Sequence, residues 1–288
     1  MKPAPFEYVA PRTVDEALDA LARHGDDAKV LAGGQSLVPM LNFRLARPAV
    51  LVDVNRVAGL DGLAQADGVL RVGALVRQRR LERWAAGQAP LLHAGLRLVG
   101  HPAIRTRGTV GGSIAHADPA AELPALLLAC DGAVLVRRGR GERVVAAGEF
   151  FVGPLLTVLA ADELVTETRW ALPPPAAGWG LHEVARRHGD FALAGAVAVV
   201  TLRGGRVASA RVVVFGCGSR PALLSESEAV LAGRAPNAAL LAEASRAGTA
   251  ALEAHEDLHA TADYRRRAAR TLVARALADA VGRAKDQE

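Results

Sequence analysis

The stretch LAGGQSLVPML, from Leu31 to Leu41, places two adjacent glycines, an amide and a hydroxyl between a strand-like apolar run and a helix-like one. A second glycine pair, Gly111-Gly112, stands in TVGGS, from Thr109 to Ser113. Glycine adopts positive φ and allows close approach of a ligand, and successive N–H groups in such a turn form a concavity that favours an anion. Either pair alone is also explained by an ordinary tight turn. Two such turns, each flanked by hydroxyl or amide side chains and each beside a helix, favour a diphosphate site.

Neither pair belongs to a common nucleotide-binding signature. Neither fits GxxxxGK[ST] or GxGxxG, so the sequence supports neither a Walker ATPase nor a Rossmann site. If Ser36 opens the helix that follows it, the free N–H groups of that helix lie beside the first concavity. A dinucleotide bound here would require a different fold.

The first part of the chain alternates helical and strand patterns. The run TVDEALDALARHG (13–25) predicts a helix, because Thr13 with Glu16 forms a capping-box pattern and Gly25 is a typical C-cap. Further helices are expected at 91–100 and 123–130. Strands are expected at 28–34, 49–54, 68–75 and 162–172.

The proline run PPPAAG (173–178) is the clearest boundary in the chain. Beyond it, a strand at 181–187 precedes two strands within 191–216, joined by Gly204-Gly205 as a hairpin. Helices follow at about 225–233, at about 237–252 and from about 261. On the last one, Tyr264, Ala268, Leu272, Ala276 and Val281 form one stripe, with Tyr264 as a core anchor. The neighbouring run 265–267, three arginines, is interpreted as a solvated face or a subunit contact.

Composition restricts the class of protein. The chain has 288 residues, 51% of them hydrophobic, which favours a globular protein of two domains. The net charge is +5, but 30 acidic residues are interspersed with the basic ones and aromatics are only 4%, so a nucleic-acid partner is not expected. The two cysteines, Cys130 and Cys217, form no cluster-binding or zinc motif. No signal core or membrane span is recognised, and a cytoplasmic protein is expected.

Two segments of the chain resemble a known family. AGGQSLVPMLNFRLARP (32–48) and IRTRGTVGGSIAHADPAAELPALLLA (104–129) are similar to the FAD-binding medium subunit of molybdenum hydroxylases, the group of carbon monoxide dehydrogenase medium chains and xanthine dehydrogenase FAD-binding subunits. The resemblance continues through 186–198 and 261–277, so it covers nearly the whole chain in order. These motifs carry no information about the substrate.

The resemblance implies an α+β fold. It consists of a vanillyl-alcohol-oxidase-type FAD-binding domain at 1–176, with subdomains at about 1–56 and 57–176. A C-terminal domain at 177–288, with a three-stranded antiparallel sheet and helices, follows it. The resemblance also implies the residues that bind FAD, which are Lys29, Val30, Leu31, Ala32, Gly33, Gly34, Gln35, Ser36, Leu37, Thr109, Val110, Gly111, Gly112, Ser113, Asp118, Leu164 and Arg187.

The implied function is electron transfer within a complex. A small [2Fe-2S] subunit would deliver electrons from a large molybdenum-cofactor subunit to the FAD of this chain, which would pass them to an external acceptor, in a dimer of heterotrimers. Gln35 stands where carbon monoxide enzymes often have His, Ser113 replaces a frequent Asn, and His116 and Phe191 also differ. These departures argue against carbon monoxide as the substrate, but not against FAD.

Alternatives remain for individual residues and for the whole chain. Asp118, before Pro119, is either a helix N-cap or an acceptor for a ribose or adenine group. Arg187 is either a solvated charge or a positive group near the flavin pyrimidine ring. His101, His116 and His188 lack metal-ligand spacing and are interpreted as loop or surface residues. A stand-alone flavin oxidase or dehydrogenase, or a flavin-binding module without redox activity, would share the same fold.

Overall fold

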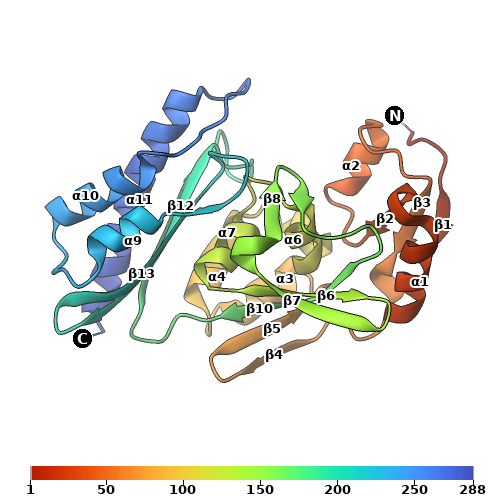
Figure 1. Ribbon diagram of the computed structural model, residues 1–288, viewed down its shortest axis with the longest axis horizontal. Helices are drawn as coiled ribbons and strands as arrows, with labels where there is room; N and C mark the ends of the chain where they lie inside the picture. Colours follow the sequence, from red (N-terminus) through yellow and green to blue (C-terminus); the bar gives the residue numbers. More distant parts are fainter. Residues whose placement is uncertain (1, 288) are drawn as a thin grey trace.

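The protein consists of three units side by side, seen in a computed structural model that describes residues 2–287 (Figure 1). The first unit has a parallel sheet in the order β1-β3-β2, made of β1 (Glu7–Val9), β2 (Ala28–Leu31) and β3 (Val50–Asp53). Its helices are α1 (Val14–His24) and α2 (Leu37–Asn42), with short 3-10 turns η1 (Gly25–Asp27) and η2 (Val54–Arg56). The predicted capping box at Thr13 and Glu16 is confirmed.

The middle unit has a five-stranded antiparallel sheet in the order β4-β5-β10-β6-β7. Its strands are β4 (Leu63–Ala66), β5 (Val69–Gly73), β6 (Ala133–Arg138), β7 (Gly141–Ala146) and β10 (Leu164–Ala171), and β8 (Phe151–Gly153) pairs with β9 (Leu156–Thr157). Its helices are α3 (Gln78–Ala85), α4 (Pro90–Leu98), α5 (Pro102–Arg107), α6 (Val110–His116), α7 (Glu122–Ala129) and α8 (Ala147–Phe150).

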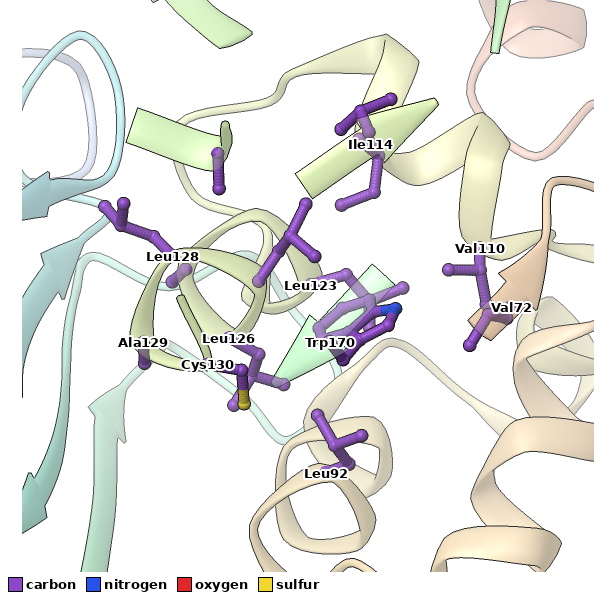
Figure 2. Close-up of a cluster of buried hydrophobic side chains, with 14 of the residues drawn as sticks. Val72, Leu92, Val110, Ile114, Leu123, Leu126, Leu128, Ala129, Cys130 and Trp170 are labelled. Atoms are coloured by element: carbon purple, nitrogen blue, oxygen red, sulfur yellow. The ribbon is translucent and has the colours of Figure 1, made fainter. Parts of the chain in front are cut away.

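The core of the middle unit holds α6 in place. Figure 2 shows Val110 and Ile114 of α6 with Leu123 and Leu126 of α7 around Trp170 of β10. Trp170 is fully buried, and its indole N–H donates to the Thr168 hydroxyl (2.8 Å). Apolar burial of side chains this large dominates local stability, so the segment that carries the second glycine pair is rigidly anchored.

The third unit has an antiparallel sheet in the order β11-β12-β13-β14. Its strands are β11 (Gly178–Val184), β12 (Ala194–Arg203), β13 (Arg206–Phe215) and β14 (Ala222–Leu223), and its helices are α9 (Ser225–Leu231), α10 (Ala238–Thr249) and α11 (Ala262–Lys285). The predicted hairpin is confirmed, because Gly204 and Gly205 link β12 to β13 and both have positive φ. The sheet has a fourth, two-residue strand, β14, where three strands were expected.

The third sheet is packed on both faces. On one face, Gly178 and Gly180 of β11 allow the backbone of α11 to approach so closely that a Cβ at either position would overlap a helix carbonyl. On the other face, Val197, Val213 and Phe215 join the core of the middle unit. The third unit is therefore fixed to the middle one by a largely apolar seam.

The buried stripe of α11 differs from the predicted one at its first turn. Leu272, Ala276 and Val281 are buried as expected, but Tyr264 is 40% exposed and Arg265 is 2% exposed. Tyr264 is therefore not a core anchor, and Arg265 is not part of a solvated face. The reason is that the Arg265 guanidinium finds buried partners, described below, which the periodicity of apolar residues does not reveal.

Candidate functional site

The glycine loop, defined as Ala32–Ser36, leaves the carboxyl end of β2 in the parallel sheet, which is where open parallel sheets commonly bind ligands. Its turn depends on Gly34, which has φ +72°. The backbone N–H groups of Gly33, Gly34, Gln35 and Ser36 donate no hydrogen bond to any group among residues 2–287. Four consecutive free amides are unusual in a folded chain, and they form a donor set suited to an anion.

The two glycine segments lie against each other, as the sequence predicts. A Cβ on Gly33 would lie 2.5 Å from the carbonyl oxygen of Arg107 and 2.8 Å from Cα of Gly108, just before α6. A Cβ on Gly112 would lie 3.6 Å from Cβ of Ala32. The φ of Gly33 is not positive, so the turn itself does not require a glycine at this position. Glycine is required because the two backbones approach too closely for a side chain.

The second glycine pair is not a turn, contrary to the prediction. Gly111 and Gly112 lie in the first turn of α6, whose N-cap is Thr109. The N–H groups of Val110 and Gly111 donate to the carbonyls of Val76 (2.9 Å) and Ala74 (3.0 Å), and the N–H of Gly112 donates to the Thr109 hydroxyl (3.1 Å). The amides of Val110, Gly111 and Gly112 are therefore not free to bind a ligand. The segment contributes two residues without side chains and the half-buried Ser113 hydroxyl, which has no partner among the described residues.

Asn55 and Arg77 hold the two segments together, and sequence reasoning missed both. Asn55, in η2, donates through Nδ2 to the carbonyl of Ala32 (2.8 Å) and accepts from Nη2 of Arg77 (2.8 Å). Arg77 also donates through Nη1 to the carbonyl of Arg107 (2.5 Å). The capping position of Asp53 before Asn55 was the only sequence signal for this network.

We expect Arg77→Met to weaken binding of an anionic ligand at the glycine loop by about ten- to a hundredfold. The physical reason is the loss of two hydrogen bonds from a charged donor, each of about 1.5–3 kcal/mol. The measurement is the Kd for FAD by flavin fluorescence. Arg80→Met is the matched control, since Arg80 is exposed and reaches only Asp61; equal Kd values for the two variants would contradict the expectation.

Asp118 does not cap the following helix, contrary to one interpretation of the sequence. Helix α7 begins at Glu122 with Ala121 as its N-cap, and Asp118 instead accepts from the N–H of Ala120 through Oδ1 (2.9 Å). Its second carboxylate oxygen has no partner among residues 2–287. His116, the last residue of α6, is half-buried; burial lowers its pKa, which the nearby Asp118 raises and Lys29 lowers. Lys29 and Asp118, both expected at the site, therefore lie around one imidazole.

Leu164 and Arg187, the last two residues predicted to bind FAD, lie in different surroundings, one buried and the other exposed. Leu164 is buried at the start of β10, in the same core cluster as Val30 and Ala32. Arg187 is exposed on the loop between β11 and β12, and its guanidinium has no hydrogen-bond or ion-pair partner among the described residues. The tip of this loop meets the start of α5, since a Cβ on Gly189 would lie 2.9 Å from the His101 ring.

Two carboxyl groups, those of the buried Glu122 and the half-buried Glu183, lie at the seam between the middle and third units. Burial, reinforced by the nearby Glu183, raises the pKa of Glu122 to about 8. Burial also raises the pKa of Glu183, on β11, to about 7, and its Oε2 atom is buried without a hydrogen-bond partner among the described residues. Glu122 therefore keeps its proton at neutral pH and adds no negative charge beside Asp118.

The arrangement fits the diphosphate of a dinucleotide. The free amides of the glycine loop supply the donors, and Gly112 brings no side chain to the contact with Ala32. Within residues 2–287, no group of three His, Cys, Asp or Glu residues is arranged to hold a metal ion, and no helix is long and apolar enough to cross a bilayer.

Comparisons with known proteins find similar sequences and similar solved structures. Residues 4–171 match the FAD binding domain in molybdopterin dehydrogenase, and residues 179–280 match the CO dehydrogenase flavoprotein C-terminal domain. The chain is 41% identical to the 6-hydroxypseudooxynicotine dehydrogenase complex subunit alpha of Paenarthrobacter nicotinovorans, over 99% of this chain and 97% of that one. It is 38% identical to the caffeine dehydrogenase subunit beta of a Pseudomonas species, over 98% and 97%. A solved carbon monoxide dehydrogenase from Hydrogenophaga pseudoflava, lacking the Mo-pyranopterin moiety, superposes with TM-score 0.95 at 36% identity, covering 98% of this chain and 99% of that one.

Proposed function

We propose, from the premise that this chain belongs to the family of FAD-binding medium subunits of molybdenum hydroxylases, that its glycine loop binds the FAD diphosphate. The observation that carries the proposal is the set of four free amides, Gly33 to Ser36, in a loop that lies against Gly108 and Gly112. Charge-assisted hydrogen bonds from amides to phosphate oxygens are about twice as strong as neutral ones. The half-buried Ser113 hydroxyl, which has no partner among the described residues, supplies a further donor in this proposal.

The chain is the electron-transferring oxidoreductase subunit of its complex. FAD, when bound, supplies the capacity to accept and release electrons, and the protein supplies binding, orientation and electrostatics. In our proposal the free carboxylate oxygen of Asp118 accepts a hydrogen bond from a hydroxyl group of the cofactor. The unpaired guanidinium of Arg187 places positive charge beside the pyrimidine edge of the ring, where reduction increases electron density. Lys29, Val30, Leu31 and Leu37 complete the proposed surface, and Leu164 supports it from the core cluster that also contains Val30 and Ala32.

The proposed partners are a small [2Fe-2S] subunit and a large subunit with the molybdenum cofactor, assembled as a dimer of heterotrimers. Cys130 and Cys217 are both buried, in two separate core clusters, so neither thiol is free to ligate a cluster. Relatives are named as medium chains or complex subunits, which supports partner subunits for this chain. Two free thiols also support a cytoplasmic, reducing setting.

The proposed division into domains assigns residues 1–176 to the FAD-binding domain and residues 177–288 to a C-terminal domain that packs on it. Pro173 to Pro175 separate β10 from β11, and proline runs of this kind are typical of boundaries. The sheet of the third unit packs its second face on the middle unit, which supports a fixed position for the loop that carries Arg187.

The test is to purify the chain alone and together with candidate small and large subunits. We expect the chain alone to bind one FAD with a flavin spectrum and to oxidise no small substrate. The co-expressed complex is expected to reduce this flavin when substrate is added. An uncoloured chain after reconstitution with FAD would overturn the proposal, and substrate oxidation by the chain alone would favour a stand-alone flavin enzyme.

A further inference from the structure

We propose that Arg265 of α11 is a positioning residue that fixes the 185–193 loop, and with it Arg187, for the cofactor. The inference rests on the proposed function for the role of Arg187, but its structural basis is independent. Arg265 is the first of three successive arginines, and it alone of the three is buried.

The surroundings of Arg265 are those of a buried clamp. Nη1 donates to the carbonyl oxygens of Leu193 (2.8 Å) and Gly216 (2.7 Å), and Nη2 pairs with Oδ2 of Asp257 (2.7 Å). Nε is buried and has no partner among the described residues. A buried guanidinium with an unpaired donor carries a large desolvation cost, and an apolar side chain of similar volume is often at least as stable. Stability alone therefore does not explain a charge here, whereas fixing the relative position of three segments does.

The segments that Arg265 joins lead to two expected cofactor contacts. Leu193 closes the base of the 185–193 loop, where its N–H donates to the carbonyl of Val184 (2.8 Å). Gly216 donates through its own N–H to the carbonyl of Pro119 (2.8 Å), the residue after Asp118. Gly216 also has φ +73°, and a Cβ there would lie 2.7 Å from the carbonyl oxygen of Ala192. The clamp thus sets the base of the loop relative to Asp118, while the tip of the loop rests on His101.

The experiment compares Arg265→Met with Arg187→Met and with the double variant in the full chain. Arg267→Met is the matched control, since it removes an exposed arginine from the same turn. The readouts are the Kd for FAD, the midpoint potential of the bound flavin, and the melting temperature without FAD. We expect Arg265→Met to raise the Kd about tenfold and to shift the potential in the same direction as Arg187→Met.

The double variant separates positioning from general stabilisation. If Arg265 acts through Arg187, the shift in flavin potential of the double variant equals that of Arg187→Met alone. Additive shifts in potential, or a change confined to the melting temperature without FAD, would overturn the inference. Should Arg265→Met not fold, Asp257→Asn, which neutralises the carboxylate partner of the guanidinium and leaves its two carbonyl partners, is expected to give a smaller shift in the same direction, and no shift would overturn the inference. Absence of FAD from the unmutated chain would instead refute the proposed function.

Discussion

Gly33→Ala is expected to abolish retention of FAD during purification. A single methyl group at this position would lie 2.5 Å from the carbonyl oxygen of Arg107 and 2.8 Å from Cα of Gly108. Both atoms belong to backbone that α5 and α6 fix in place, so the glycine loop must move instead. Its four free amides then lose their present arrangement, and the proposed contacts to the diphosphate are lost together. We expect the Kd for FAD to rise at least a hundredfold, about 2.7 kcal/mol.

The measurement is bound flavin per chain, with Gly62→Ala as the control. Gly62 also has no positive φ, and a Cβ there meets no atom within 4 Å. The control therefore adds the same methyl group without the collision. Gly34→Ala tests a different cause, because Gly34 has φ +72° and an alanine there is strained even without a neighbour. Full flavin occupancy in Gly33→Ala would exclude the glycine loop as the diphosphate site.

Gly112→Ala is expected to have a smaller effect than Gly33→Ala. Its Cβ would lie 2.6 Å from the hydroxyl oxygen of Thr109, a side chain that can rotate, rather than from backbone. The loss is then that of the N-cap hydrogen bond from the Gly112 N–H to the Thr109 hydroxyl, about 1 kcal/mol. Gly111 and Gly112 thus lie at the start of a helix, whereas Gly33 and Gly34 belong to the loop whose backbone amides are free.

Local signals in the sequence predicted local structure well. The capping box at Thr13 and the hairpin at Gly204-Gly205 are both confirmed. Both features depend on residues within a few positions of one another, so the local sequence is sufficient to predict them. The convergence of the two glycine segments was also predicted, but from their shared composition and not from any contact visible in the sequence.

The errors arise where distant backbone atoms decide the outcome. The glycines after Thr109 were interpreted as a turn. A threonine whose hydroxyl accepts from the N–H three residues later is also an N-cap pattern, and here the carbonyls of Ala74 and Val76 accept from the next two N–H groups, so that a helix begins. Arg265 was placed on a solvated face because its acceptors, the carbonyls of Leu193 and Gly216, are far away in sequence. The spacing of side chains along a helix does not reveal that a backbone carbonyl of a distant segment needs a hydrogen-bond donor from that helix.

Glu122→Gln is expected to make the protein more stable at alkaline pH and to flatten the dependence of stability on pH. The pKa of Glu122 is raised to about 8 from an ordinary value near 4.5, first by burial and then by Glu183. Below pH 4.5 the carboxyl is protonated in both the folded and unfolded states, so it contributes no pH dependence. Between pH 4.5 and 8 the unfolded chain releases the proton and the folded chain retains it. The free energy of unfolding therefore falls as pH rises, by roughly 3–5 kcal/mol over the whole interval.

Glutamine has the shape of the protonated acid but cannot ionise, so the variant lacks this loss. Relative to the unmutated protein, we expect Glu122→Gln to gain roughly 2–4 kcal/mol at pH 8 and less than about 1 kcal/mol at pH 5, measured by urea unfolding at both values. Glu183→Gln is expected to act in the same direction over a narrower interval, because burial raises the pKa of Glu183 only to about 7. Glu149→Gln, on an exposed position of α8, is the control and should leave the pH dependence unchanged. Parallel pH profiles for Glu122→Gln and the unmutated protein would show that Glu122 ionises freely in the folded state, and that the seam beside Asp118 carries a second negative charge.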